Sequence, residues 1–574
     1  MNSRRLPELL APAGSPEALD AAIKGGADAI YVGGHLLNAR MNARNFTEEQ
    51  LSESVKKCHR NGVKLYVTLN TAVLDRELLS AVEYADGLYK MGVDALIVAD
   101  LGLAFALKGR YDDMGIHAST QASGHNAECA RELQALGFDR MVCARELSGK
   151  DIKKLCEESP IEIEQFIHGA MCVSQSGQCL ASAMMGGRSG NRGVCAQPCR
   201  MCYNGAYPLS LKDMCLALHI PELIESGVCS LKIEGRMKSP AYVYEVTRTY
   251  RRLLDEGRNA TEDELNTLSE IFSRSGFTDG YYVGEINGEM NGVRRESDIS
   301  ATRSVKTEFK SVKRDIPRIT VRERSVTETF VPPKAAKREK KSGKPINTAR
   351  FLFPEQIVGE GYFSHIYLPL ERFERCGADG VVLPPSVFPT KEAELERLLE
   401  RAVSKGATHA LVCNIGQIKT AEKYGLILHG DIRLNVFNTL NAKILTELGL
   451  RDVMLSPELT LPQMRDIAAP KCAVVYGRIP IMTLTKPIDL KGQPVSVLRD
   501  KTGATFQIVK EFGYDILLNS VPFYMADKQS KLDENGIRGR HFNFTTESRR
   551  EAAEVIEHYK NGVPSTGNIR RIAY

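Results

Sequence analysis

Long apolar runs are missing from this chain of 574 residues, and no segment approaches the roughly 18 consecutive apolar residues that a membrane span needs. We therefore expect no membrane insertion. The first residues, Met-Asn-Ser-Arg-Arg-Leu-Pro, contain no apolar signal region, so we expect a cytoplasmic location. The sequence also has neither a His-Glu-x-x-His helix nor a Gly-x-Ser-x-Gly turn, which removes the usual signatures of zinc peptidases and serine hydrolases.

The sequence does contain a regular alternation of short β-branched runs with segments of helical periodicity. Hydrophobic residues make up 43% and charged residues 26%, as in water-soluble chains, and the length allows several domains. Strands that alternate with helices over about 250 residues predict an α/β fold, namely a TIM-type (β/α)8 barrel with its active site at the carboxyl ends of the strands. The expected strands are 9–12, 29–32, 64–69, 95–98, 115–118, 140–143, 161–168 and 230–233.

Cysteine is concentrated in one loop of this expected barrel. Seven of the fourteen cysteines lie within residues 172–229. Gaps of seven, sixteen and four residues separate Cys172, Cys179, Cys195 and Cys199, so these thiols do not lie on one regular element and a folded loop has to gather them. A glycine-rich loop crowded with sulfur is typical of an iron–sulfur centre.

Other interpretations of the cysteines stay open at this point. A structural zinc ion favours closely spaced pairs of ligands, which Cys195, Cys199 and Cys202 offer. Buried structural thiols are another interpretation, whereas disulfides would need an oxidising compartment. Cys229 precedes the last expected strand and should lie at the opposite face of the barrel. We place Cys215 on or near a short helix.

The stretch Glu164–Cys179 resembles the signature of peptidase family U32, a name inherited from collagenase-like proteases. Glu, Phe, Gly, Ala, Cys, Gly and Cys occur there in the order of the signature, while Ala181 stands where the family carries a larger aliphatic residue. Segments 8–14, 42–46, 116–121 and 232–236 also resemble the family. The resemblance covers the part of the chain that we assign to the first domain, residues 1–290, firmly and the remainder loosely.

The resemblance implies an enzyme. Members of this family are oxygen-independent hydroxylases that use a 4Fe–4S cluster, take the hydroxyl group from prephenate, and act on a pyrimidine of tRNA or rRNA or on a quinone ring. The family pattern also implies that the cluster is held by Cys172, Cys179, Cys195 and Cys199, with Cys199 favoured over Cys202. Because some members act in pairs, a partner subunit of the same family is a further expectation.

Charged side chains on or just after the strand ends are the candidate binding residues. Prephenate is a dicarboxylate, and guanidinium groups bind carboxylates in a bidentate manner. We therefore select Arg44, Arg145 and Arg236 as cofactor-binding residues.

Candidate catalytic residues lie on the seventh and eighth expected strands. Glu164 and His168 are separated by an even number of residues and so should share one face of their strand, as Glu234 and Arg236 should on the last one. We take His168 and Glu234 as proton carriers, with Glu164 on the same face.

Three rival activities remain. Cys172 and His168 suggest the nucleophile and base of a thiol peptidase, which is the inherited family label. Cys195, Cys199 and Cys202 satisfy the Cys-x3-Cys-x2-Cys spacing of radical SAM enzymes. Hydroxylation of a quinone is the third, but a basic segment and the lack of an amphipathic membrane-seeking helix favour RNA over a quinone.

That basic segment spans residues 303–344 and carries fourteen Lys and Arg against five Asp and Glu, a net charge of +9. It has little apolar periodicity, which indicates a flexible linker, and its clustered cations indicate a strap for RNA phosphates. We place the linker domain at residues 291–348.

Residues 349–574 repeat part of the first domain. His117–Asn126 and the segment down to Leu147 recur as His429–Asn438 and the segment down to Leu459, at a constant offset of 312. We therefore expect a second, degenerate half of the same family, with a β-hairpin at 495–509 that turns on Asp500–Gly503. This copy carries no cysteine cluster, so it should serve shape or binding.

Overall fold

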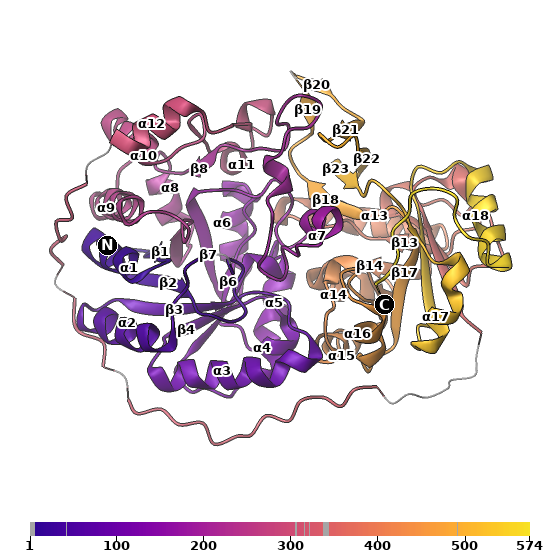
Figure 1. Ribbon diagram of the computed structural model, residues 1–574, viewed down its shortest axis with the longest axis horizontal. Helices are drawn as coiled ribbons and strands as arrows, with labels where there is room; N and C mark the ends of the chain where they lie inside the picture. Colours follow the sequence, from indigo (N-terminus) through magenta and orange to yellow (C-terminus); the bar gives the residue numbers. More distant parts are fainter. Residues whose placement is uncertain are drawn as a thin grey trace.

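The computed structural model describes residues 6–41, 43–304, 307–314, 316–320, 322–336, 344–490 and 492–573. The described chain forms two closed barrels of eight parallel strands, which lie side by side (Figure 1). The predicted TIM-type barrel and the predicted second barrel-like half are both confirmed. The boundaries that we assigned to the domains stay predictions.

The first barrel contains all eight strands at the positions predicted from the sequence. The last strand of this barrel, β9, pairs in parallel with both β7 and β1 and so closes the ring. The barrel strands are β1 (Glu8–Pro12), β2 (Ala29–Gly33), β3 (Lys64–Leu69), β4 (Ala95–Val98), β5 (Gly115–Ala118), β6 (Arg140–Val142), β7 (Glu162–Gly169) and β9 (Ser230–Ile233). Two further strands, β8 (Asp213–Cys215) and β10 (Phe277–Thr278), extend the sheet beyond β7.

Helices follow the strands and form the outer layer, and their ends are encoded locally. In the first helix Ser15 accepts a hydrogen bond from the Ala18 N–H, and Gly26 ends the helix with a φ of 89° that favours glycine. The helices of this part are α1 (Pro16–Gly25), α2 (Glu48–Arg60), α3 (Leu78–Met91), α4 (Leu101–Leu107), α5 (Ala127–Ala135), α6 (Gly149–Glu158), α7 (Ala181–Gly186), α8 (Ile220–Glu225), α9 (Pro240–Glu256), α10 (Glu262–Ile271), α11 (Gly280–Val283) and α12 (Glu296–Ser304).

The second barrel is also complete, because β25 pairs in parallel with both β11 and β17. Its strands are β11 (Ile346–Phe351), β12 (His365–Pro369), β13 (Gly380–Val382), β14 (His409–Val412), β15 (Ile427–Gly430), β16 (Leu450–Met454), β17 (Lys471–Gly477) and β25 (Gly539–Phe544). Its helices are α13 (Glu392–Ser404), α14 (Ile418–Glu422), α15 (Thr439–Glu447), α16 (Leu461–Asp466), α17 (Gln529–Glu534) and α18 (Arg549–Asn561). None of the helices in the described ranges is long and apolar enough to cross a membrane.

An antiparallel sheet is inserted between β17 and β25. It contains β18 (Pro480–Leu484), β23 (Tyr514–Leu518), β22 (Thr505–Glu511) and β21 (Val497–Arg499), in that order. The predicted hairpin is confirmed, because β21 and β22 pair in antiparallel fashion and the Asp500 N–H donates to the Ala504 carbonyl. Two short strands, β19 (Asp489–Leu490) and β20 (Gln493–Pro494), form a second hairpin, and β24 (Phe523–Tyr524) adds an antiparallel strand to β17.

The two barrels face each other with the carboxyl ends of their strands. Asn438, the N-cap of α15 after β15, donates to both carboxylate oxygens of Asp100, which follows β4. Asn414, after β14, donates to the Ser123 carbonyl after β5 at 2.8 Å. The loops that carry active sites in barrels of this kind are therefore enclosed between the two halves.

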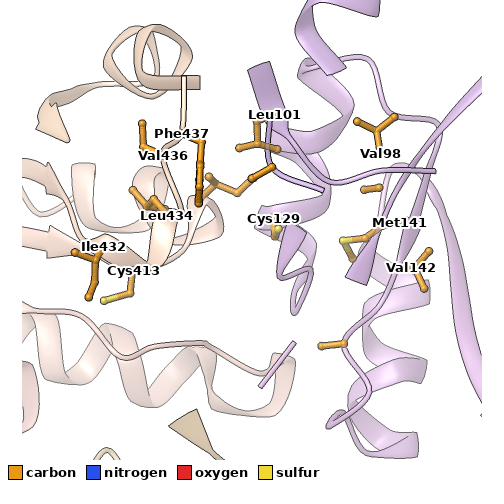
Figure 2. Packing of buried hydrophobic residues seen from close by; sticks show 14 of the residues in the cluster. Val98, Leu101, Cys129, Met141, Val142, Cys413, Ile432, Leu434, Val436 and Phe437 are labelled. Carbon is orange, nitrogen blue, oxygen red and sulfur yellow. The ribbon is translucent and has the colours of Figure 1, made fainter. Parts of the chain in front are cut away.

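Apolar side chains continue across this contact. Figure 2 shows Val98, Leu101 and Met141 of the first barrel opposite Leu434 and Phe437 of the second, all buried in one hydrophobic cluster. The close approach depends on small residues, since a Cβ on Gly416 would lie 2.6 Å from Asn126 Oδ1. The two barrels share one continuous core at their contact.

The described part of the basic segment, within 307–336, runs as an extended trace along the outer edge of the first barrel and reaches the second, where the Ala336 N–H donates to the Asp466 carbonyl (Figure 1). Arg314 forms an ion pair with Asp28 in front of β2. Arg324 donates to the Val93 carbonyl at 2.7 Å and pairs with Asp113 in front of β5. These contacts lie at the amino ends of the strands, which is the face opposite to the cysteine loop.

The contact between the barrels predicts a stability effect at Asn438, which is fully buried. In Asn438→Ala the Asp100 carboxylate loses its side-chain donor and α15 loses its N-cap, so we expect a loss of about 2–4 kcal/mol in the free energy of unfolding. Chemical denaturation followed by circular dichroism measures this. Asn561→Ala, at an exposed helix end, is the control and should change stability by less than about 0.5 kcal/mol. Equal stability of the two variants would contradict the account of this contact.

Candidate functional site

The cysteine loop, residues 170–203, leaves the carboxyl end of β7 and is held by both barrels. On the side of the second barrel, the N–H groups of Gln175 and Leu180 donate to the carbonyls of Thr483 and Ile481 in β18 at 2.7 and 2.9 Å. The side chain of Gln178 donates to the Pro385 carbonyl after β13 at 2.7 Å. The second barrel therefore supplies backbone partners to a loop with little regular structure of its own.

The first barrel holds the same loop through a buried carboxylate. Glu146 accepts hydrogen bonds from the Ser176 N–H and hydroxyl, both at 3.0 Å, and from His125 at 2.8 Å. Burial disfavours the charged form of Glu146, but the hydrogen bond and charge of His125 outweigh this and lower its pKa. The charged carboxylate of Glu146 therefore holds the cysteine loop in place through Ser176.

The loop brings four thiols near one another, namely Cys172, Cys179, Cys195 and Cys199. Burial raises the pKa of Cys199 to about 12, and the charges of Cys172 and Cys195 add to the rise although Arg200 opposes it. Burial likewise raises the pKa of Cys179, and the other three thiols contribute. A bound cationic centre would reverse this balance, because it stabilises the thiolate form.

The surroundings of the thiols are polar and positively charged. Arg145 Nη1 lies 3.7 Å from Cys172 Sγ, and the Gln197 N–H donates to Cys195 Sγ at 3.3 Å. Arg200 donates to the Met171 carbonyl at 3.1 Å and fixes the start of the loop. Hydrogen bonds to sulfur and nearby cations suit thiolates that hold a metal centre of net negative charge.

Arginines and a glutamate form the mouth of the barrel beside Cys172. Glu234, just after β9, pairs with Arg40 at 3.4 Å and with Arg145 at 3.3 Å. Burial works against ionisation of Glu234, but the charges of both guanidinium groups outweigh it and lower its pKa. Arg145 also stacks on Phe166, with its guanidinium carbon 4.2 Å from the ring centroid. Arg145 Nε is buried and has no hydrogen-bond partner within the described residues.

Arg236 adds a third guanidinium group to this mouth. Its Nη1 donates to Thr68 Oγ1 at 3.0 Å, and only 5% of the residue is exposed. Burial lowers the pKa of Arg236 to about 10, and the charge of Arg40 adds to this. Across the described ranges, no carboxylate lies within 4.0 Å of its nitrogens. A buried guanidinium group without a paired carboxylate is suited to an anionic ligand.

Glu164 lies deeper in the barrel than the mouth. It is fully buried and pairs with Lys232 at 2.7 Å and with Arg140 at 3.2 Å. Arg140 in turn pairs with Glu8 on β1, so Glu164 belongs to an ion-pair layer inside the barrel. The structure does not bring Glu164 to the thiols.

His168 points away from the barrel interior, contrary to our prediction that it shares a face with Glu164. The register between β7 and β9 shifts between Phe166 and His168, and such a bulge reverses the side on which the following residue lies. His168 Nδ1 lies 3.3 Å from the hydroxyl of Tyr250 on α9, in the outer layer. Strand alternation alone did not reveal the bulge.

Arg44 is also absent from the mouth. Arg44, which we selected as a cofactor-binding residue, is exposed, and Arg40 is the arginine of this loop that pairs with Glu234. The chain between β2 and α2 is irregular, with positive φ at Leu37 and Asn45, so sequence spacing does not show which arginine turns inward. In the sequence, Arg40 differs from other arginines only in lying close to segment 42–46, which resembles the family.

The other cysteines are placed as follows. Cys229 borders the cavity at the amino ends of the strands, as predicted from its position before β9. Cys215 lies at the end of strand β8, shortly before the short helix α8, and its sulfur contacts the Tyr250 hydroxyl at 3.6 Å. The choice of Cys199 over Cys202 as a fourth ligand stays a prediction. Cys199 lies near the other three thiols, because the charges of Cys172 and Cys195 raise its pKa and its own charge raises the pKa of Cys179.

Comparison with known proteins gives the family. The model of peptidase family U32 matches residues 14–292 and 381–480. The chain belongs to peptidase family U32. The second matched range lies in the second barrel, so the family resemblance extends to both halves of the molecule.

Family U32 relatives carry different names. The chain is 40% identical over 266 residues to tRNA hydroxylation protein P1 of Bacillus subtilis, covering 43% of this chain and 63% of that protein. It is 40% identical over 294 residues to the 23S rRNA 5-hydroxycytidine C2501 synthase of Escherichia coli, covering 49% and 43%. A collagenase of Porphyromonas gingivalis is 36% identical over 313 residues, covering 49% and 75%. The chain thus spans less than two thirds of the first two relatives.

The placement of His168 predicts a pH dependence of stability. Burial, helped by the charge of Lys238, lowers the pKa of His168 from 6.5 to about 3. The unfolded chain binds a proton at this histidine near pH 6.5 but the folded chain does not, so folding loses about 1.4 kcal/mol per pH unit as the pH falls through this window. In His168→Gln this part of the loss should disappear. Denaturation of both proteins between about pH 6 and pH 4, referenced to pH 8, measures it. Parallel stability curves would show that His168 gains its proton in the folded state.

Proposed function

We propose that this U32 protein hydroxylates a pyrimidine of tRNA or rRNA without oxygen, with a 4Fe–4S cluster on Cys172, Cys179, Cys195 and Cys199 and with prephenate as the hydroxyl donor. The observation that carries the proposal is the set of four thiols at the mouth of a barrel whose relatives include a tRNA hydroxylation protein and an rRNA hydroxycytidine synthase, both 40% identical. The alternative substrate is a quinone, and the mass spectrometry of RNA nucleosides described below distinguishes it from RNA.

The donor set fits an iron–sulfur cluster. Four thiols on one glycine-rich loop match the usual ligand type, and Arg145 beside Cys172 compensates negative charge on the thiolates. When bound, such a cluster supplies electron transfer or Lewis-acid chemistry at the mouth. Cys172 is exposed, so a nucleobase can approach the thiols from solvent.

The three guanidinium groups of the mouth are our candidates for binding a dicarboxylate. Arg236 has no paired carboxylate within the described residues, and the buried Arg145 Nε has no hydrogen-bond partner there. One carboxylate of prephenate would compensate Arg236, and the other would reach Arg145 and Arg40. Glu234 would hold these two arginines in place before the ligand binds. A carboxylate oxygen of Glu234 would then exchange a proton with the bound ligand.

Peptidase activity is the second candidate, because one relative is named a collagenase. The expected thiol and base do not pair within the described structure. Cys172 contacts Arg145, and His168 contacts Tyr250 of the outer layer. A histidine that is neutral and buried behind β7 is badly placed to activate Cys172.

Replacement of the proposed ligands should abolish the modification. In a strain that lacks the native gene, we expect the hydroxylated pyrimidine to be absent from total RNA when Cys172→Ser or Cys199→Ser is supplied. Cys229→Ser is the matched control, because that thiol lies at the opposite face, and it should restore the nucleoside to the wild-type amount. Mass spectrometry of RNA nucleosides, together with the absorption of the purified proteins near 400 nm, provides the readout, as expected of a 4Fe–4S centre.

Three outcomes would change the assignment. RNA nucleosides that are identical with and without the gene would exclude RNA as substrate and favour a quinone or a peptide. Loss of the cluster in Cys202→Ser with retention in Cys199→Ser would show that Cys202, and not Cys199, is the fourth ligand. Loss in both variants, with cleavage of added S-adenosylmethionine by the wild type, would favour the radical SAM interpretation.

The basic segment predicts a salt effect on RNA binding. Four of its exposed cations, Lys313, Arg318, Arg322 and Lys334, are free of the barrel contacts made by Arg314 and Arg324. Neutralising all four should reduce the slope of log affinity against log salt by up to about 3.6, at ~0.7 to 0.9 for each phosphate that the protein no longer neutralises. Filter binding of tRNA at several salt concentrations measures the slope.

Arg314→Gln with Arg324→Gln is the matched control for this experiment, because both side chains already pair with carboxylates of the first barrel. This pair of substitutions should lower thermal stability and leave the salt slope near its wild-type value. An unchanged slope in the fourfold variant would show that the basic segment only connects the barrels.

A further inference from the structure

The amino end of the second barrel, opposite to the contact between the barrels, gathers imidazole and carboxylate side chains from five neighbouring strands. Three of these residues lie at or just before the starts of their strands, and the other two lie two residues after the starts of theirs. We refer to the set as the imidazole cluster, and its members are His365 (β12), Asp379 (before β13), His409 (β14), His429 (β15) and Asp452 (β16).

Three members of the imidazole cluster lie close enough to share one ion. The ligand atoms of His365, Asp379 and His409 all lie within 4.8 Å of one another. His365 Nδ1 lies 2.8 Å from Asp379 Oδ2, and the rings of His365 and His409 have centroids 3.8 Å apart. Gly380 on the strand between them leaves room for its neighbours, since a Cβ there would lie 2.4 Å from the Tyr367 ring and 3.2 Å from His409 Cβ.

The remaining two members fix the tautomer of His409. Both oxygens of Asp452 lie 3.1 Å from His429 Nδ1, and a carboxylate only accepts, so this nitrogen carries the proton. His429 Nε2 then accepts from His409 Nδ1 at 3.0 Å. The lone pair of His409 is consequently on Nε2, which has no hydrogen-bond partner in the part of the chain that the structure describes. Such a carboxylate–histidine relay behind a ligand is the arrangement that orients metal-binding imidazoles.

The site is open on the solvent side. About a quarter of the His365 side chain and two fifths of the Asp379 side chain are exposed, at 24% and 41%, whereas His409 is buried. An ion would therefore be held by groups at the wall of the barrel and keep open positions for water. Two imidazoles and a carboxylate are typical ligands of zinc and of other divalent first-row metals.

We propose that His365, Asp379 and His409 bind one divalent transition-metal ion of the zinc class at the amino end of the second barrel, with His429 and Asp452 as the supporting relay. This site is separate from the cysteine loop and uses nitrogen and oxygen ligands. It joins the starts of β12, β13 and β14, so the bound ion should also stabilise the second barrel.

Titration of the full chain with Co²⁺ tests the proposal. After removal of metals with a chelator, we expect one equivalent of Co²⁺ to give ligand-field bands without the thiolate charge-transfer band that the cysteine loop would produce. His365→Asn and Asp379→Asn, both at partly exposed positions, should lose this equivalent. Asp452→Asn should weaken binding by about 10-fold or more, because it removes the relay. His558→Gln, an exposed histidine of α18, is the control and should bind as the wild type does.

Circular dichroism of each variant shows whether the chain is folded. Loss of the Co²⁺ equivalent in folded His365→Asn would support the site. Uptake equal to wild type in both His365→Asn and Asp379→Asn, or a cobalt spectrum that arises from thiolates alone, would overturn it.

Discussion

The docking of two barrels with the carboxyl ends of their strands facing each other is the constraint on which the site depends. The cysteine loop has little regular structure, so it needs partners for its backbone groups, and both barrels provide them. Its N–H groups donate to β18 of the second barrel, and Glu146 of the first barrel accepts from Ser176. The barrel that lacks the cysteine loop thereby becomes necessary for the geometry of the barrel that carries it.

This arrangement also explains the charges at the mouth. Arg40, Arg145 and Arg236 are brought together by the ends of different strands, and Glu234 compensates only part of their charge. The excess of guanidinium groups beside Cys172 suits an anionic ligand and thiolates that hold a metal centre. Deeper in the barrel, Glu164 and Arg140 compensate each other and contribute to the packed interior.

The fold was largely predictable because hydrophobic alternation is a local property. All eight strands of the first barrel, the repeat at an offset of 312 and the hairpin on Asp500 were visible in the sequence. The site was predictable only in part. The cysteines and Arg145 follow strand ends, but the bulge before His168 and the irregular loop that selects Arg40 over Arg44 depend on tertiary contacts. The imidazole cluster needs the closed second barrel, because its members are far apart in sequence.

The most direct test of the account is the metal content of the full chain after purification without oxygen. A cysteine loop that carries a 4Fe–4S centre should yield about four iron and four acid-labile sulfide ions per chain, with a Mössbauer spectrum of that centre. Replacement of Thr483 by proline, which distorts the β18 edge that holds Gln175, should lower the iron content while Cys172 and the other thiols are all present. Stoichiometric zinc in the loop without iron or sulfide would contradict the account.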